Sequence, residues 1–192
     1  MNPSVSLGKN SLNYGIVAGM VLIVYSLFLY FFDLMFYKPF LLNNVVGTLI
    51  VIVFMVIGTK HLRDAVMHGS MSYGKAFLSA FLIGLFAMAV SLIFNNILTY
   101  LIDPGIRDKA FQYSAEQMLK KGRFTEEQIE AMIEQQKQMS SKLWVVLIGQ
   151  FFALLGMGLI NAVIALVAAA FLKKEGDTFA DIMQEVSPEE QK

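Results

Sequence analysis

Charged residues are absent from long stretches of this chain and dense between them. Four segments of 21 to 30 residues contain no charged side chain, and they lie at 10–32, 39–59, 76–102 and 143–172. A soluble helix needs polar residues on its solvent face every turn or two, whereas about 20 apolar residues suffice to cross the hydrocarbon core of a bilayer. The pattern therefore predicts four membrane-spanning helices, at about 12–32, 41–59, 73–102 and 143–172.

The free energy of insertion supports this interpretation. The second predicted span, 41–59, contains twelve Leu, Ile, Val or Phe residues. At the centre of a membrane helix these contribute together about −4 to −7 kcal/mol, and no central charge opposes them. The first segment is longer than the apolar part of a secretory signal and lacks a small-x-small cleavage site, so we expect it to be retained as a span.

The 40 residues between the third and fourth spans predict a helical hairpin outside the bilayer. Asp103-Pro104-Gly105 is typical of a helix end, and Gly122 fits the end of a first loop helix. Thr125 and Gln128 have the spacing of a capping box, which predicts the start of a second helix. No helix-breaking residue lies between Met139 and Leu143, so this second helix could continue into the fourth span.

We therefore expect an all-α integral membrane four-helix bundle at 1–174, with a helical hairpin in the loop at 103–142. The hairpin could cap the bundle, which amphipathic helices usually do, or serve as a docking surface or lid. An acidic tail follows at 175–192, with a net charge of −5. Its apolar residues repeat at helical spacing; these residues are Phe179, Ile182, Met183 and Val186. The tail could dock on a protein or remain disordered until bound.

The distribution of charge predicts an orientation. Basic residues directly adjoin the spans on the side that holds both termini and the loop at 60–75, whereas Asp33 and Asp103 adjoin spans on the other side. Since cytoplasmic loops carry an excess of Lys and Arg, we expect both termini in the cytoplasm.

Composition excludes several classes of function. The 15 basic and 15 acidic residues balance, so there is no overall charge for binding nucleic acid, and the chain has no cysteine to form a disulfide or a thiolate metal site. The charged residues Asp33, Lys75 and Asp103 lie only at the ends of spans, which argues against a proton-coupled transporter or an intramembrane protease. His61, Asp64 and His68 share one loop, but their spacing fits no established zinc site, and we interpret them as solvated. We expect no enzyme activity, cofactor or metal.

Uncharged polar residues within the spans have two interpretations. Asn95, Asn96, Gln150 and Asn161 are expected to form hydrogen bonds between helices, although they could line a path for a neutral solute if they converged. Ser26, Ser79, Ser91, Thr99, Asn43 and Asn44 belong to the same class.

Small residues in two spans predict close helix packing. Gly15 and Gly19 form a Gly-x-x-x-Gly pattern, and Gly149 and Gly156 belong to a dense series of small residues in the fourth span. That density predicts a central, tightly packed fourth span, or packing in a dimer.

Several short motifs resemble a known bacterial membrane family. They are Gly15 to Gly19, Ser72-Tyr73-Gly74-Lys75-Ala76-Phe77, Ile102-Asp103-Pro104, Thr125-Glu126-Glu127-Gln128-Ile129-Glu130 and the Gly-rich fourth span before Lys173-Lys174. Over roughly residues 12–174 the chain resembles the family called domain of unknown function 4199, which is frequent in Bacteroidetes. The resemblance implies a four-span inner-membrane protein with a helical loop, and it implies no activity.

The main hypothesis is a non-enzymatic, multi-pass inner-membrane protein that interacts with the lipid bilayer and with a second copy or another protein. The loop at 103–142 and the tail at 175–192 would be its contact surfaces. The alternative is a channel or carrier for a small neutral solute.

Overall fold

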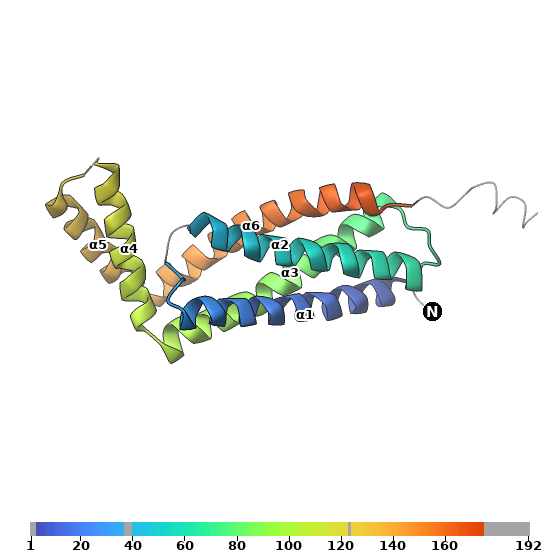
Figure 1. Ribbon diagram of the computed structural model, residues 1–192, viewed down its shortest axis with the longest axis horizontal. Coiled ribbons are helices and arrows are strands. Elements are labelled where there is room, and N and C mark those ends of the chain that lie inside the picture. The colour runs from blue at the N-terminus through green and yellow to red at the C-terminus, as the bar shows by residue number, and fades with distance from the viewer. Residues whose placement is uncertain (1–2, 37–39, 123, 175–192) are drawn as a thin grey trace, which may run out of the picture.

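The computed structural model describes residues 3–36, 40–122 and 124–174. Four long helices, α1 (Pro3–Phe31), α2 (Phe40–His61), α3 (Tyr73–Ile97) and α6 (Leu143–Leu172), run side by side as an antiparallel bundle (Figure 1). Two shorter helices, α4 (Gly105–Lys121) and α5 (Glu126–Ser140), form a hairpin at one end. The described residues contain no strand, and one bridge joins Met71 to Lys174. The predicted all-α fold with a loop hairpin is confirmed.

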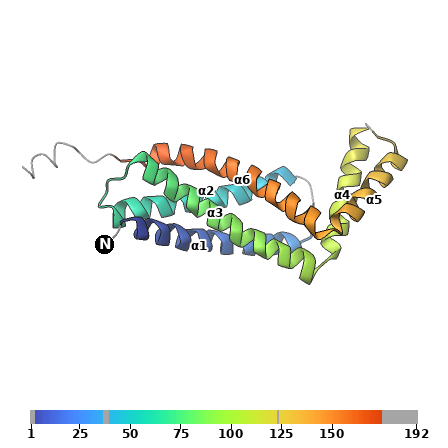
Figure 2. The same ribbon diagram turned by 180° about the vertical axis from the view of Figure 1, so that it is seen from behind.

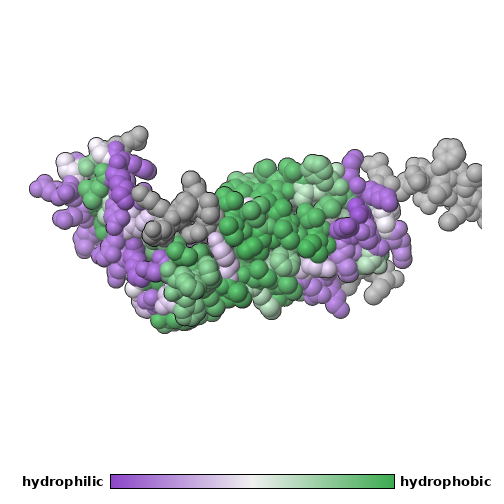
Figure 3. Space-filling model, viewed as in Figure 1, coloured by the Kyte–Doolittle hydropathy of each residue, from purple (hydrophilic) through white to green (hydrophobic). Residues whose placement is uncertain are grey.

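The surface of the bundle identifies a membrane protein. Four helical stretches are long and apolar enough to span a bilayer, at Leu7–Phe31, Asn44–Val66, Tyr73–Ile102 and Leu143–Leu172. Figure 3 shows a broad apolar surface along the middle of the bundle, with hydrophilic residues on the hairpin and at the opposite end. Because exposed apolar side chains are stable in lipid but not in water, this belt marks the part of the chain that lies in the membrane.

The central helix is α3, which contacts α1, α2 and α6 (Figure 2). The expectation that the fourth span is central and tightly packed is wrong. The first buried residue of α6 is Asn161, about two thirds of the way along the helix, and large residues before it, such as Phe152 and Leu159, are mostly exposed. Small residues permit close packing but do not require it, and the first half of α6 separates from the other helices instead.

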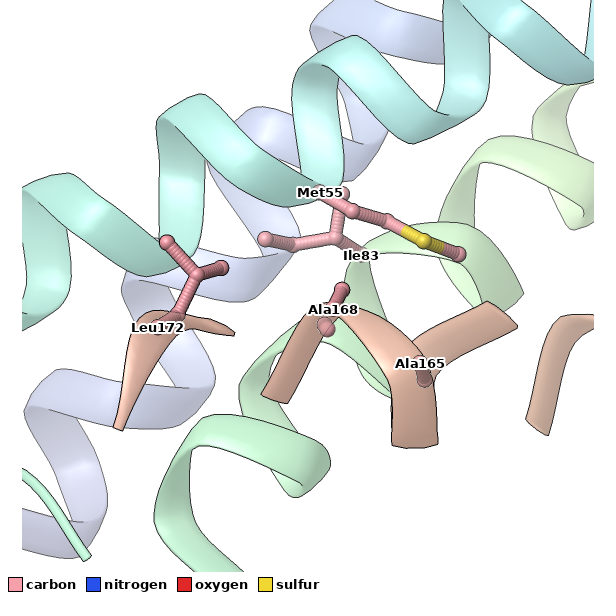
Figure 4. Packing of buried hydrophobic residues seen from close by; sticks show 6 residues of the cluster. Met55, Ile83, Ala165, Ala168 and Leu172 are labelled. Carbon is pink, nitrogen blue, oxygen red and sulfur yellow. The ribbon is translucent and has the colours of Figure 1, made fainter. Parts of the chain in front are cut away.

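The tightest packing lies in the half of the bundle near the termini. Figure 4 shows Met55 of α2 and Ile83 of α3 against Ala165, Ala168 and Leu172 of α6, and Ala80 completes this cluster. A second cluster contains Leu7, Leu62, Met71, Ala76 and Ala169. Alanine dominates both clusters on α6 and α3, since small side chains let helices approach closely in a membrane.

The hairpin begins where α3 is forced to stop. A π-helical turn, Leu98–Ile102, extends α3, and Asp103 then has non-helical φ and ψ of −136° and 87°, as expected before Pro104. The Gly105 N–H donates to Asp103 Oδ1 at 2.9 Å and starts α4. At the other end, Lys142 is extended and separates α5 from α6. The expectation that the second loop helix continues into the fourth span is therefore wrong.

The turn between α4 and α5 contains the capping bonds that the sequence predicts. Gly122 ends α4 with a left-handed φ of 62°. Thr125 Oγ1 accepts from the Gln128 N–H at 3.3 Å, and Gln128 Oε1 accepts from the Thr125 N–H at 3.0 Å. These two bonds satisfy N–H groups at the start of α5 and fix the hairpin turn.

Candidate functional site

The intramembrane amides bind different partners on neighbouring helices. Asn95 Oδ1 accepts from Ser26 Oγ of α1 at 3.3 Å, and its Nδ2 donates to the Ser91 carbonyl at 2.8 Å. Gln150 Nε2 of α6 donates to Asn96 Oδ1 at 2.5 Å. The adjacent residues Asn95 and Asn96 therefore connect α3 to two different helices, α1 and α6. This geometry serves helix packing rather than a common polar path.

Asn161 forms a further connection between α6 and α3, deeper in the bundle. It is buried, and its Nδ2 donates to the Phe81 carbonyl at 3.1 Å. Its Oδ1 lies directly against Gly84, where an added Cβ would overlap it, and the Met55 Cε would be only 2.5 Å away. A glycine at position 84 is thus required for Asn161 to reach the α3 backbone.

The two predicted glycine patterns have different environments. A Cβ on Gly15 would lie 2.5 Å from Phe86 Cβ, and one on Gly19 would lie 2.6 Å from Val90 Cβ, so both glycines allow α1 to approach α3 closely. A Cβ on Gly149 or Gly156 of α6 would meet nothing within 4 Å. Within one described chain, only the first pattern packs helices together.

A buried polar cluster, which the sequence analysis missed, joins α1, α2 and α3 near the termini. Thr59 Oγ1 donates to Ser79 Oγ at 3.3 Å, and Ser11 Oγ lies 3.4 Å from the same atom; all three residues are fully buried. Asn10 Nδ2 donates to the Gly58 carbonyl at 2.9 Å. Only Ser79 was recognised from its position inside a span. The others lie at predicted span ends, where polar residues are ordinarily solvated.

His61 belongs to this cluster rather than to a metal site. Its Nδ1 lies 2.9 Å from Asn10 Oδ1. The amide nitrogen of Asn10 donates to Gly58, so the atom that faces His61 is the amide oxygen, which can only accept. His61 Nδ1 is therefore the protonated ring nitrogen in this bond. Asp64 instead pairs with Arg63 at 2.7 Å, and Arg63 also donates to the Leu172 carbonyl at 3.2 Å. Among the described residues no three His, Asp or Glu side chains gather as a metal site would require. His61 is exposed, as expected from the sequence, and it also forms this hydrogen bond to Asn10.

Polar contacts attach the base of the hairpin to the bundle. Arg107 Nη2 donates to the Ser140 carbonyl and hydroxyl at 3.1 and 2.9 Å, and its guanidinium lies 5.2 Å from the centre of the Tyr100 ring. Lys109 Nζ pairs with Asp33 Oδ1 at 2.7 Å. Hydrogen bonding to Asp33 raises the pKa of Lys109 above its ordinary value. Arg107 thus joins α4 to α5 and to the turn after α3, and Lys109 joins α4 to the residues that follow α1.

Above this base, α5 and the first half of α6 diverge and enclose a groove of about 740 Å³. The apolar residues of α5 face two sides: Ile129 is buried toward α4, while Met132 and Met139 face the groove and are 40% and 45% exposed. The opposite wall contains Val145, Gly149 and Gln150 of α6. This groove, called the α5–α6 groove below, is lined by uncharged residues. In addition to the residues named above, its lining contains Tyr100, Met118, Gln135, Gln136, Ser140, Val146 and Ala153.

Two regions singled out in the sequence lie outside the described side chains. They are the stretch around Asn43 and the tail at 175–192, including Phe179, Ile182, Met183 and Val186.

Comparison with known proteins agrees with the architecture. No curated protein and no solved structure matches the chain. The family described as "Protein of unknown function (DUF4199)" matches residues 13–174, which include most of the first span, the other three spans and the hairpin. This membrane protein, with its four-span bundle and projecting hairpin, therefore belongs to the DUF4199 family.

Proposed function

We propose that this protein is a non-enzymatic, multi-pass protein of a bacterial inner membrane that binds another protein through the hairpin at 103–142. The observation that carries the proposal is the position of the hairpin. It projects from the end of the bundle, contacts α6, the turn after α3 and residues 33–36, and exposes Leu119 and Phe124 at its tip (Figure 1). Exposed apolar residues on a rigid, polar support are typical of a docking surface.

The chemistry of the hairpin tip fits a protein partner. Phe124 is 44% exposed, and next to it lie Lys120 and Lys121 on α4 and Glu126 and Glu127 on α5. An apolar centre with charged residues of both signs around it is the usual composition of a reversible protein interface. The capping box keeps Phe124 in a fixed place, which lowers the entropy that binding must overcome.

Photo-crosslinking in native membranes tests this proposal. A benzophenone amino acid at Phe124 is expected to give a discrete adduct with another protein. The matched control is the same substitution at Phe171, which is 82% exposed on the membrane part of α6 and should crosslink only to lipid. Recovery of the uncrosslinked chain alone from the Phe124 variant, together with normal growth after deletion of the hairpin, would refute the proposal.

The proposed orientation places both termini in the cytoplasm. It is supported by the basic residues Lys9, Lys60, Lys75 and Lys174 at the terminal end of the bundle. Since the chain has no cysteine, single-cysteine variants give a direct test. In intact cells a membrane-impermeant maleimide should label Phe124→Cys and not Lys60→Cys, and the reverse result would invert the topology.

The alternative, transport of a neutral solute, is less well supported. Asn95, Asn96, Gln150 and Asn161 hydrogen-bond between helices at three separate places instead of facing one path. The test is the flux of neutral solutes into liposomes that contain the purified protein. A flux above that into empty liposomes would favour this alternative over docking.

A further inference from the structure

The α5–α6 groove has the size and lining of a ligand site. Its volume of about 740 Å³ lies within the range of about 300–1,000 Å³ that is common for small-molecule sites. Met132, Met139 and Val145 provide an apolar surface, and thioether side chains adapt readily to flexible apolar ligands. The amides of Gln135, Gln136 and Gln150 provide neutral hydrogen-bonding groups. Among the described residues no charged side chain lines the groove, so its ligand is not recognised through an ionic group.

The position of the groove along α6 shows which layer of the bilayer surrounds it. The uncharged helix α6 has 30 residues and is about 45 Å long at 1.5 Å per residue, whereas the hydrocarbon core is about 30 Å thick. Counted from Leu172 at the basic end, about 20 residues cross this core, which ends near Ala153. Ala153 is also the last α6 residue in the wall of the groove. The groove therefore starts where the acyl chains of the bilayer meet the ester and glycerol layer.

The wall of the groove continues into a surface that already faces lipid. On α6, Met157 and Ile160 follow the groove residue Ala153 on the same helical face, and they are 55% and 61% exposed. A lipid in the membrane can thus reach the groove along α6 without crossing the protein. A charged peptide or soluble anion would find no matching group there.

We propose that the α5–α6 groove binds one acyl-ester lipid of the bilayer. The upper part of its acyl chain lies against Ala153 and Gly149, and its ester and glycerol oxygens lie beside Met139 and accept from the amides of Gln135 and Gln136. Gln150 already uses its Nε2 for Asn96, so the donors to the lipid are the amides of Gln135 and Gln136. The bound lipid covers Met132 and Met139, which the fold alone leaves exposed.

Quenching of tryptophan fluorescence by brominated lipids tests this site. The chain has a single tryptophan, Trp144, and the Trp144→Phe variant therefore has no tryptophan fluorescence of its own. In this background, Met139→Trp places a reporter in the groove, and Gln138→Trp places one on the next residue, which is exposed and does not line the groove. Vesicles of phosphatidylcholine brominated near the ester end of the acyl chain are expected to quench Met139→Trp several-fold more than Gln138→Trp.

A second variant separates a bound lipid from simple immersion of the hairpin. Gly149→Leu fills the groove without a clash, since its Cβ meets nothing within 4 Å, and it should reduce the quenching of the Met139→Trp reporter. Gly158→Leu, equally unobstructed and outside the groove, should not. Equal quenching of both reporters, no quenching of either, or no effect of Gly149→Leu would each overturn the proposal. None of these results depends on the protein partner of Phe124.

Discussion

The contact between Gly84 and Asn161 predicts a strong energetic coupling between α3 and α6. In Gly84→Ala the new methyl group overlaps Asn161 Oδ1 and approaches Asn161 Cγ to 2.8 Å, so the amide must leave its position and lose its bond to the Phe81 carbonyl. Overpacking of a closely packed site costs about 1–3 kcal/mol, and an interhelical hydrogen bond in a membrane contributes about 0.6 kcal/mol. The better helix propensity of alanine returns up to about 1 kcal/mol. We expect a net loss of about 1–2 kcal/mol.

A double-mutant cycle isolates this coupling. Asn161→Ala removes both the hydrogen bond and the obstructing amide, and it should cost about 1 kcal/mol alone. In the double variant, Gly84→Ala should be nearly neutral, because only the flexible end of Met55 remains close to the new methyl group. The coupling energy should therefore be about 1–2 kcal/mol and favourable in the double variant.

Unfolding in mixed micelles with a rising fraction of sodium dodecyl sulfate, followed by circular dichroism, measures these differences. Gly156→Ala is the matched control, because its Cβ would meet nothing within 4 Å, and it should be neutral or slightly stabilising. If Gly84→Ala were as well tolerated as Gly156→Ala, or if the losses from Gly84→Ala and Asn161→Ala simply added, the proposed contact between α3 and α6 would be wrong.

Three further predictions follow from other contacts. Gly19→Leu should separate α1 from α3 and lower the free energy of unfolding by about 1–3 kcal/mol in the same micelle assay, whereas Gly158→Leu should be tolerated. Thr125→Ala should destabilise the start of α5 by about 1 kcal/mol, seen as faster amide hydrogen exchange at Gln128 but not at residues of α3. The raised pKa of Lys109 means that its pairing with Asp33 stabilises the hairpin base below the ordinary lysine pKa and is lost as the pH rises through the raised value. NMR titration of labelled Lys109 should show its pKa falling toward the ordinary value in Asp33→Asn, and an unchanged titration would refute the pairing.

The sequence predicts the local features of the hairpin because each depends on neighbouring residues. Thr125 and Gln128 are three residues apart, and their reciprocal bonds need only the first turn of a helix. The stop at Asp103 likewise depends on Pro104 alone. The break at Lys142 has no comparable signal, since Ser141 and Lys142 are both compatible with a helix. It arises from the different directions that α5 and α6 take in the folded protein.

The pairing of polar groups depends on distant parts of the chain and cannot be read from spacing. Ser11 and Ser79 are 68 residues apart, and Asn161 and Phe81 are 80 apart. Their hydrogen bonds exist only because α1 and α6 both pack on α3. Before the helices are placed, a serine or asparagine inside a span is equally consistent with a helix contact or a solute path. The sequence thus yields the correct residue types for helix contacts and not their partners.

The two halves of α6 explain why small residues misled the sequence analysis. Ala165, Ala168 and Ala169 pack against α2 and α3, whereas Gly149 and Gly156, of similar size, touch no other helix. In water, leaving a large apolar residue such as Phe152 exposed would oppose such separation, but in lipid the exposed side chain keeps an apolar environment and the penalty disappears. Specific contacts through Asn161 and the alanines therefore hold the second half of α6 against the bundle. The first half of α6 has the bond between Gln150 and Asn96 but no comparable cluster of alanines. It therefore diverges from the bundle and forms one wall of the α5–α6 groove.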